Sequence, residues 1–303
     1  MKIFLTGQSG FIGSHLCARL GSHELEFLRH DLRDHDKVTQ QVIQSNPDII
    51  IHLAARTEVE QSFNEQISFS EINYVGTVNL IEAAKFCKNL QRFLFASTME
   101  VYGWQPSGDA IRDGKSLDTV PVFDETTLPC PNAPYALAKL AGENYLGYAS
   151  RAYGIPFTAV RQTNCYGRID NDFFVTERII SQMLQNYQKI DLGDPRPYRN
   201  FIFIDDLIDA WCCIIDRTDV GVNEVYCVGP DNAVQIKHYA QMIAEKLDWH
   251  GSINWYSRPV RPGEVFVLNS SNKKMTQDFD WNPKTGLDRG LNLAIHRWKI
   301  NNL

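Results

Sequence analysis

The order of strand-like and helix-like segments predicts an α/β fold: a Rossmann-type, doubly wound parallel sheet with a smaller C-terminal substrate-binding lobe. Three observations support this prediction. Short apolar runs alternate with segments of helical period over residues 1–165. The run DIIIHL at residues 48–53 is nearly all apolar, as a strand covered on both faces must be. A glycine-rich turn directly follows the first apolar run.

The strands of the first half are expected where apolar and β-branched residues gather, at residues 2–6, 25–28, 48–53, 92–96 and 157–160. The helices between them are expected at residues 13–20, 34–44, 74–87 and 135–152. Leu16, Cys17 and Leu20 give the first helix its apolar spacing, Pro47 ends the second, and Pro134 begins the last. Right-handed crossovers then place the helices on both faces of the sheet.

The pattern loosens after residue 165. A helix is expected at residues 173–187, a strand, turn and strand at 188–204, and a helix from Asp205, with Asp205 as its N-cap. We therefore predict a dinucleotide-binding domain at 1–165 and a substrate-binding lobe at 166–303, partly interleaved with it. Residues 103–123 are expected to form a long polar loop, and a loop of that length beside a site is often functional.

Composition narrows the class of function. The chain has 303 residues and a net charge of −6, which argues against a nucleic-acid or membrane-surface partner. No apolar run reaches about 18 residues, so no transmembrane helix is expected, and the N-terminus lacks the cleavage site of a signal peptide. The seven cysteines have no CxxC spacing. They predict buried free thiols in a reducing cytoplasm and no metal site.

The segment TGQSGFIG, residues 6–13, places Gly7, Gly10 and Gly13 between the first strand and the first helix. Glycines permit a tight turn and the close approach of a pyrophosphate to backbone N–H groups, and the helix N-terminus adds favourable partial charge. A purely structural turn is the alternative. The position at the first strand–helix junction of an alternating chain favours a dinucleotide site.

The end of the second strand bears on the choice of cofactor. An acid there binds the ribose hydroxyls of NAD, but this strand ends in Arg29 and His30, and a cation suits the 2′-phosphate of NADP. Asp31 follows and is a candidate for the ribose or the adenine amino group. The choice between NAD and NADP therefore stays open, slightly toward NADP, and a solvent-facing Arg29 is the alternative.

Tyr135 and Lys139 form YALAK, with four residues placing both side chains on one helix face. A nearby ammonium stabilises a phenolate and lowers the tyrosine pKa, giving a base that can take a hydroxyl proton while hydride leaves the same carbon. A surface helix is the alternative. The position between the fourth and fifth strands of a dinucleotide fold favours the catalytic interpretation.

Several motifs together resemble the extended short-chain dehydrogenase/reductase family, and within it the nucleotide-sugar epimerases and dehydratases. They are TGxxGFIG, HLAA (52–55), NYVGTVNLIEAA (73–84), STMEVYG (97–103), YALAK (135–139) and RPGE (261–264). The resemblance covers nearly the whole chain. It implies cofactor contacts at Gly7, Gly10, Phe11, Ile12, Gly13, Arg29, Asp31, Leu32, Leu53, Ala54, Ala55, Tyr135 and Lys139.

The same resemblance implies the substrate contacts. Thr98 matches the hydroxyl that hydrogen-bonds the reacting sugar, Tyr135 the base and Lys139 the ribose-binding lysine. Asn164 resembles the asparagine that holds the substrate phosphate. Arg199 and Arg261 match the two arginines that clamp the diphosphate, which suits the planar fork of guanidinium. Without the family, a surface ion pair is the simpler interpretation of each arginine.

Glu100 indicates which reaction is catalysed. STMEVYG resembles the STDEVYG of dTDP-glucose 4,6-dehydratases, in which the glutamate removes the C5 proton of a 4-keto sugar. Glu100 and Thr98 are expected to share a face of an extended stretch, and the apolar Met99 beside Glu100 should raise its pKa. Met99 stands where those dehydratases have their acid, and a thioether cannot donate a proton. Local backbone hydrogen bonding is the alternative role for Glu100.

Three functions follow. The first is an enzyme that oxidises C4 of a nucleoside-diphosphate sugar transiently, then epimerises or dehydrates it and recycles the cofactor. The second is a 4-keto-sugar-nucleotide reductase that consumes NADPH. The third is a non-catalytic dinucleotide-binding regulator, against which the intact set of Thr98, Tyr135 and Lys139 argues. The resemblance also implies a homodimer through two copies of the Tyr135 helix.

Overall fold

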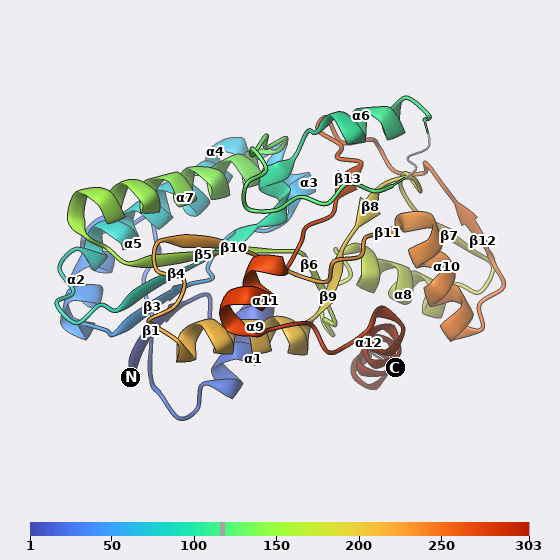
Figure 1. Ribbon diagram of the computed structural model, residues 1–303. Coiled ribbons are helices and arrows are strands. Elements are labelled where there is room, and N and C mark those ends of the chain that lie inside the picture. Colours follow the sequence, from blue (N-terminus) through green and yellow to red (C-terminus); the bar gives the residue numbers. More distant parts are fainter. Residues whose placement is uncertain (116–118, 303) are drawn as a thin grey trace.

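The central feature of the computed structural model is a six-stranded, wholly parallel sheet (Figure 1). The structure describes residues 1–115 and 119–302. The strand order is β10-β5-β4-β3-β1-β2. The strands are β1 (Lys2–Thr6), β2 (Glu24–Phe27), β3 (Ile49–His52), β4 (Arg92–Thr98), β5 (Phe157–Gln162) and β10 (Glu224–Val228). The predicted Rossmann-type fold is therefore confirmed.

Helices cover both faces of this sheet. Ile3 and Leu5 of β1 pack on one face with α1 (Phe11–Arg19) and α9 (Ile204–Asp216), while Phe4 packs on the other. That other face carries α2 (His35–Ser45), α5 (Gly76–Ala84) and α7 (Pro134–Tyr153). Figure 1 shows α5 and α7 on one side of the sheet and α1 and α9 on the other. Burial on both faces is the physical reason for the continuous apolar runs.

The remaining elements form a second lobe, at the right of Figure 1. Its three small sheets have the orders β11-β8-β13, β12-β7 and β6-β9. The strands are β6 (Asn164–Tyr166), β7 (Lys189–Asp191), β8 (Tyr198–Arg199), β9 (Phe201–Phe203), β11 (Val234–Gln235), β12 (Ser252–Asn254) and β13 (Val267–Leu268). Its helices are α8 (Val175–Gln185), α10 (Ile236–Leu247) and α12 (Leu287–Asn302). The helix α11 (Lys273–Phe279) lies instead against β10, at the edge of the central sheet.

The structure corrects the prediction for residues 188–204. The segment holds three short strands that pair with distant strands rather than with one another. Helix α9 begins at Ile204 with Phe203 as its cap, so Asp205 lies in the first turn and is not the N-cap. It still interacts favourably with the helix dipole there. The domain boundary at residue 165 stays a prediction. Two elements from the second half of the chain lie in the first domain, since β10 belongs to the central sheet and α9 to the helical layer that covers it.

Several short elements around the site were also not predicted. The expected loop 103–123 contains the helix α6 (Pro106–Arg112), and its residues 116–118 lie outside the described residues. The expected helix 74–87 consists of a π-helical turn at Glu71–Val75 followed by α5. Two further short helices precede them, α3 (Val59–Ser62) and α4 (Gln66–Ser70).

All seven cysteines are free, as predicted, but only some of them are buried. Cys87 and Cys227 are buried, while Cys130 is exposed. Across residues 1–115 and 119–302, no helix combines the length and the apolar character that crossing a membrane requires.

Candidate active site

The glycine turn between β1 and α1 has the shape that a dinucleotide pyrophosphate requires. Gly7 has φ +81°, and a Cβ atom at this position would lie 2.6 Å from the backbone nitrogen of Ala54. A Cβ atom at Gly13 would lie 2.0 Å from the carbonyl oxygen of Gly7. Gly10 caps α1, whose first N–H groups have no partner within the helix. Nearby backbone atoms therefore leave no space for a side chain at Gly7 or Gly13. The turn with its free N–H groups fits a bound diphosphate.

The segment after β3 closes the other side of this turn. His52 is fully buried and bonds the hydroxyls of Thr6 at 2.7 Å and Thr77 at 2.9 Å. Burial lowers its pKa well below the ordinary value, so the imidazole is neutral. The backbone nitrogen of Ala54 donates to the Thr6 hydroxyl at 3.2 Å. This network places Leu53 and Ala54 against Gly7, and the cofactor contacts of Leu53, Ala54 and Ala55 stay a prediction.

After β2 the chain presents an exposed basic side chain, Arg29, and an acidic side chain, Asp31, that is bound by a neighbouring arginine. Arg29 is exposed, and its backbone nitrogen donates to Gln41 Oε1 at 3.1 Å. Asp31 accepts two hydrogen bonds from the Arg33 side chain, at 2.9 and 2.6 Å, and these lower the pKa of Asp31 to about 2. Leu32 is buried, and its carbonyl accepts a hydrogen bond from Asn79. Arg33 was missed in the sequence, although it lies in the same HDLRD stretch.

The carboxyl end of β4 leads into the chemical centre. Thr98 Oγ1 accepts a hydrogen bond from the Glu100 backbone nitrogen at 3.2 Å and caps a 3₁₀ turn, Met99–Tyr102. The predicted extended stretch is therefore wrong, but Thr98, Glu100 and Tyr135 do line one cavity. Met99, between Thr98 and Glu100, is 1% exposed and packs into an apolar cluster.

Tyr135 and Lys139 occupy one face of α7, as predicted, but differ from the expected electrostatics. Burial raises the pKa of Tyr135 above its ordinary value and Glu100 raises it further, while a hydrogen bond with Thr98 lowers it. Lys139 is buried, and its Nζ donates to the carbonyl oxygen of Ala96 at 2.8 Å. Burial lowers the pKa of Lys139 to about 7, against the field of Glu143. The predicted lowering of the tyrosine pKa by Lys139 is thus replaced by a net rise.

The cavity has a volume of about 340 Å³ and lies between the carboxyl ends of the central strands and the second lobe. Thr98, Glu100 and Tyr135 line it together with Asn164, which lies on β6. Ile12, from the glycine turn, also reaches it. Its neighbour Phe11 lies 4.3 Å beneath the Arg168 guanidinium. Such a crevice at the carboxyl ends of parallel strands is the usual ligand site of an open α/β sheet.

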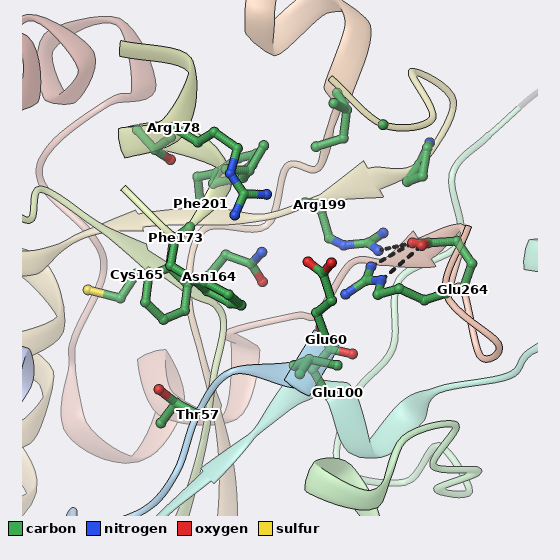
Figure 2. A pocket seen from close by; sticks show the side chains of 18 of the residues that line it. Thr57, Glu60, Glu100, Asn164, Cys165, Phe173, Arg178, Arg199, Phe201 and Glu264 are labelled. Carbon is green, nitrogen blue, oxygen red and sulfur yellow. Dashed lines mark hydrogen bonds and ion pairs between the residues drawn. The ribbon is translucent and has the colours of Figure 1, made fainter. Parts of the chain in front are cut away.

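The two predicted arginines meet in the wall of this cavity and share a carboxylate (Figure 2). Arg261 binds Glu264 through Nε at 2.9 Å and Nη2 at 2.7 Å, and Arg199 Nη2 lies 3.5 Å from the same Glu264. Arg199 also donates to the carbonyl oxygen of Val265 at 2.6 Å. Glu264 is the last residue of the RPGE motif, yet its contact with both arginines was not predicted.

Further charged residues of the cavity were missed because no motif marks them. Arg178 from α8 and Arg258 from the loop before RPGE both line it, as does Glu60 from α3. Arg258 Nη2 contacts the Glu60 carboxylate at 3.1 and 3.2 Å. The separation of 198 residues between these two side chains explains why local pattern gave no signal.

Comparison with known proteins agrees with this arrangement. The chain is 26% identical to the dTDP-glucose 4,6-dehydratase of Escherichia coli, with 100% of this chain and 94% of that one covered. The UDP-glucose 4-epimerase of Thermus thermophilus in complex with NAD superposes with a TM-score of 0.85 at 25% identity. RMD from Pseudomonas aeruginosa complexed with NADPH gives 0.83 at 26% identity. Each of these two superpositions covers 99% of this chain and 99% of the compared chain.

The family model named NAD dependent epimerase/dehydratase family matches residues 3–229, which include the whole glycine turn, the STMEVYG stretch and YALAK. It ends just after β10, the last strand of the central sheet. The protein is an enzyme with an NAD(P)-binding Rossmann fold, and it belongs to the NAD dependent epimerase/dehydratase family.

Proposed function

We propose that the protein oxidises C4 of a nucleoside-diphosphate sugar transiently and epimerises or dehydrates the product before the cofactor is recycled. The observation that carries this proposal is the joint placement of Thr98, Glu100 and Tyr135 at one cavity whose wall also holds Arg199 and Arg261. Hydroxyl, carboxylate and phenol suit proton transfer at a sugar ring, and the guanidinium groups suit a diphosphate. The relatives named above act on nucleotide sugars of this kind.

The roles of the side chains follow from their positions. A bound nicotinamide cofactor supplies the hydride acceptor and donor for the reaction. Tyr135 takes the proton of the C4 hydroxyl, and Thr98 holds that hydroxyl by a hydrogen bond. Because the pKa of Tyr135 is raised, we propose that a protonated Lys139, one helical turn away, stabilises the phenolate and binds the cofactor ribose. Asn164, Arg199 and Arg261 hold the diphosphate.

The experiment that tests this function separates it from the second candidate. Arg29 at the end of β2 favours NADP and so also favours a reductase that consumes NADPH. Purified protein is analysed by mass spectrometry for released small molecules and then incubated with UDP-, dTDP- and GDP-sugars and, in the presence of NADPH, with their 4-keto derivatives. An enzyme that oxidises C4 transiently is expected to carry bound cofactor and to convert one of these nucleotide sugars without added reductant. Conversion that requires one NADPH per product would instead establish the reductase.

Cofactor choice gives a prediction at Arg29. Arg33 occupies Asp31, so the carboxylate that would repel a 2′-phosphate is already neutralised by its neighbour. We expect Arg29→Ala to weaken NADP binding by about tenfold or more and NAD binding much less, since a charge-assisted hydrogen bond is lost. Fluorescence titration with each cofactor measures this. Equal losses for both cofactors would remove Arg29 from the 2′-phosphate site.

Assembly gives another prediction. Leu146 of α7 is fully buried, whereas Leu137 is 59% exposed and Tyr148 is 44% exposed, so the helix has an apolar face that the sheet does not cover. We propose that two copies of α7 pair across a two-fold axis. Light scattering at micromolar concentration is expected to give twice the chain mass of 34.6 kDa, and Leu137→Asp is expected to lower it. A monomeric wild-type protein would contradict this assembly.

A further inference from the structure

One arginine of the cavity wall has no carboxylate partner. Arg178 makes no side-chain hydrogen bond or ion pair with any residue of 1–115 or 119–302, and its guanidinium lies 5.4 Å from the centre of the Phe173 ring. The other cavity arginines are engaged: Arg199 and Arg261 share Glu264, Arg258 binds Glu60, and Arg168 is paired with Glu177. Figure 2 shows Arg178, Arg199 and Glu60 around the same cavity.

This arrangement concentrates positive charge in a partly buried space. Four guanidinium groups, of Arg178, Arg199, Arg258 and Arg261, face the carboxylates of Glu60, Glu100 and Glu264. A fifth cavity arginine, Arg168, is paired with the buried Glu177. Glu100 lies at the Tyr135 end of the cavity, and Asp194 is bound by Arg196. Like charges repel strongly where water is partly excluded, and burial together with Arg258 and Arg261 lowers the pKa of Arg178. Among the residues that the structure describes, Arg178 is thus the cavity arginine whose charge no carboxylate pairs.

Over the described part of the chain, the four guanidinium groups exceed the three facing carboxylates by one positive charge, which corresponds to the unpaired Arg178. A diphosphate linkage, which carries about two negative charges when both ends are esterified, suits such a site. Glu264 already holds Arg261 through both Nε and Nη2, so within residues 1–115 and 119–302 the guanidinium left open to an anion is that of Arg178. Glu60 comes from the dinucleotide-binding half and Arg258 from the second lobe, so their ion pair spans the two sides of the cavity.

We propose that Arg178 binds the diphosphate of the substrate and that Glu60 competes with this diphosphate for Arg258. The proposal rests on the proposed function for its substrate class, and it adds two arginines and a competing carboxylate to the expected clamp. In the free protein Glu60 satisfies Arg258. When the diphosphate enters, Arg258 turns from Glu60 to the phosphate oxygens, so the Glu60 contact reduces the affinity for every anion at this site.

Inorganic pyrophosphate is the probe, because it needs no knowledge of the base or the sugar. Binding is measured by calorimetry on protein saturated with NAD(P), so that the glycine turn is already filled. Glu60→Gln is nearly isosteric, and it should bind pyrophosphate roughly two- to five-fold more tightly than the wild-type protein. Arg178→Gln should bind about tenfold or more weakly, whereas Arg178→Lys should retain part of the affinity.

Two comparisons make the result specific. In an Arg258→Gln background, the gain from Glu60→Gln should disappear, because the two side chains then no longer compete. Glu65→Gln, which removes a carboxylate paired with Arg56 outside the cavity, should bind pyrophosphate like the wild-type protein. Melting temperatures verify that each variant is folded.

Unchanged or weaker binding by Glu60→Gln, or no pyrophosphate binding by the wild-type protein, would overturn the proposal. If nucleotide sugars turn over while the variants bind alike, the inference fails and the proposed function stands. If pyrophosphate binding follows the expected order but no nucleotide sugar is converted, the proposed function fails instead.

Discussion

The Tyr135→Phe variant is expected to turn over its nucleotide sugar roughly 10²–10⁴-fold more slowly than the wild-type protein. The change removes one hydroxyl from a buried side chain that lines the cavity beside Thr98 and Glu100. The ring that packs in the wall is retained, so the fold and the cofactor affinity should be nearly unchanged. A large loss of rate with intact binding is the signature of a missing base.

The pH dependence of the rate gives a second signature of the same group. Burial and Glu100 raise the pKa of Tyr135, so the fraction of phenolate increases with pH on the alkaline side. The wild-type rate should therefore rise with pH there, and the Phe variant should lose this rise. Tyr153→Phe, which removes a hydroxyl at the exposed end of the same helix, is the matched control. Full activity in Tyr135→Phe would contradict general base catalysis by this residue.

The central sheet was predictable because burial on both faces leaves a strong local pattern. Residues 3–5 and 49–51 are apolar because successive side chains pack alternately against one helical layer and the other. The sixth strand, Glu224–Val228, could not be placed in the same way. Five residues of strand character fit many positions, and its pairing with β5 depends on a crossover from the second lobe. Local periodicity carries no information on such a connection.

In the candidate site, too, residues in local motifs could be predicted, whereas contacts between distant segments could not. Gly7, Thr98, Tyr135 and Arg261 could be proposed as site residues from the sequence because each stands in a recognisable motif. The charge partners were not found, since Glu60 and Arg258, or Arg199 and Glu264, meet only after folding. The direction of the Tyr135 pKa shift was wrong for a related reason: the sequence shows that Lys139 is one turn away, but not that its Nζ donates to Ala96.

The Glu100→Gln variant is expected to lose all exchange of the substrate C5 proton while still reducing its bound cofactor. Once C4 is a ketone, the C5 proton becomes acidic because the carbanion delocalises onto the carbonyl oxygen. Glu100 lines the cavity on the turn after Thr98, and its charge raises the pKa of Tyr135, so it lies close to the phenol that we propose as the base. A carboxylate can accept that proton, whereas the neutral amide of nearly the same shape cannot.

The measurement is made in heavy water with the converted nucleotide sugar, following deuterium at C5 by NMR and the reduced cofactor by its absorbance. Glu65→Gln, outside the cavity, should exchange C5 like the wild-type protein. Exchange that persists in Glu100→Gln would assign the proton to another base. Turnover without any C5 exchange in the wild-type protein would favour a plain C4 epimerase or a reductase. Glu100 would then act only through the turn capped by Thr98 and through its field on Tyr135. Met99 is buried, and its thioether supplies no acid for eliminating water.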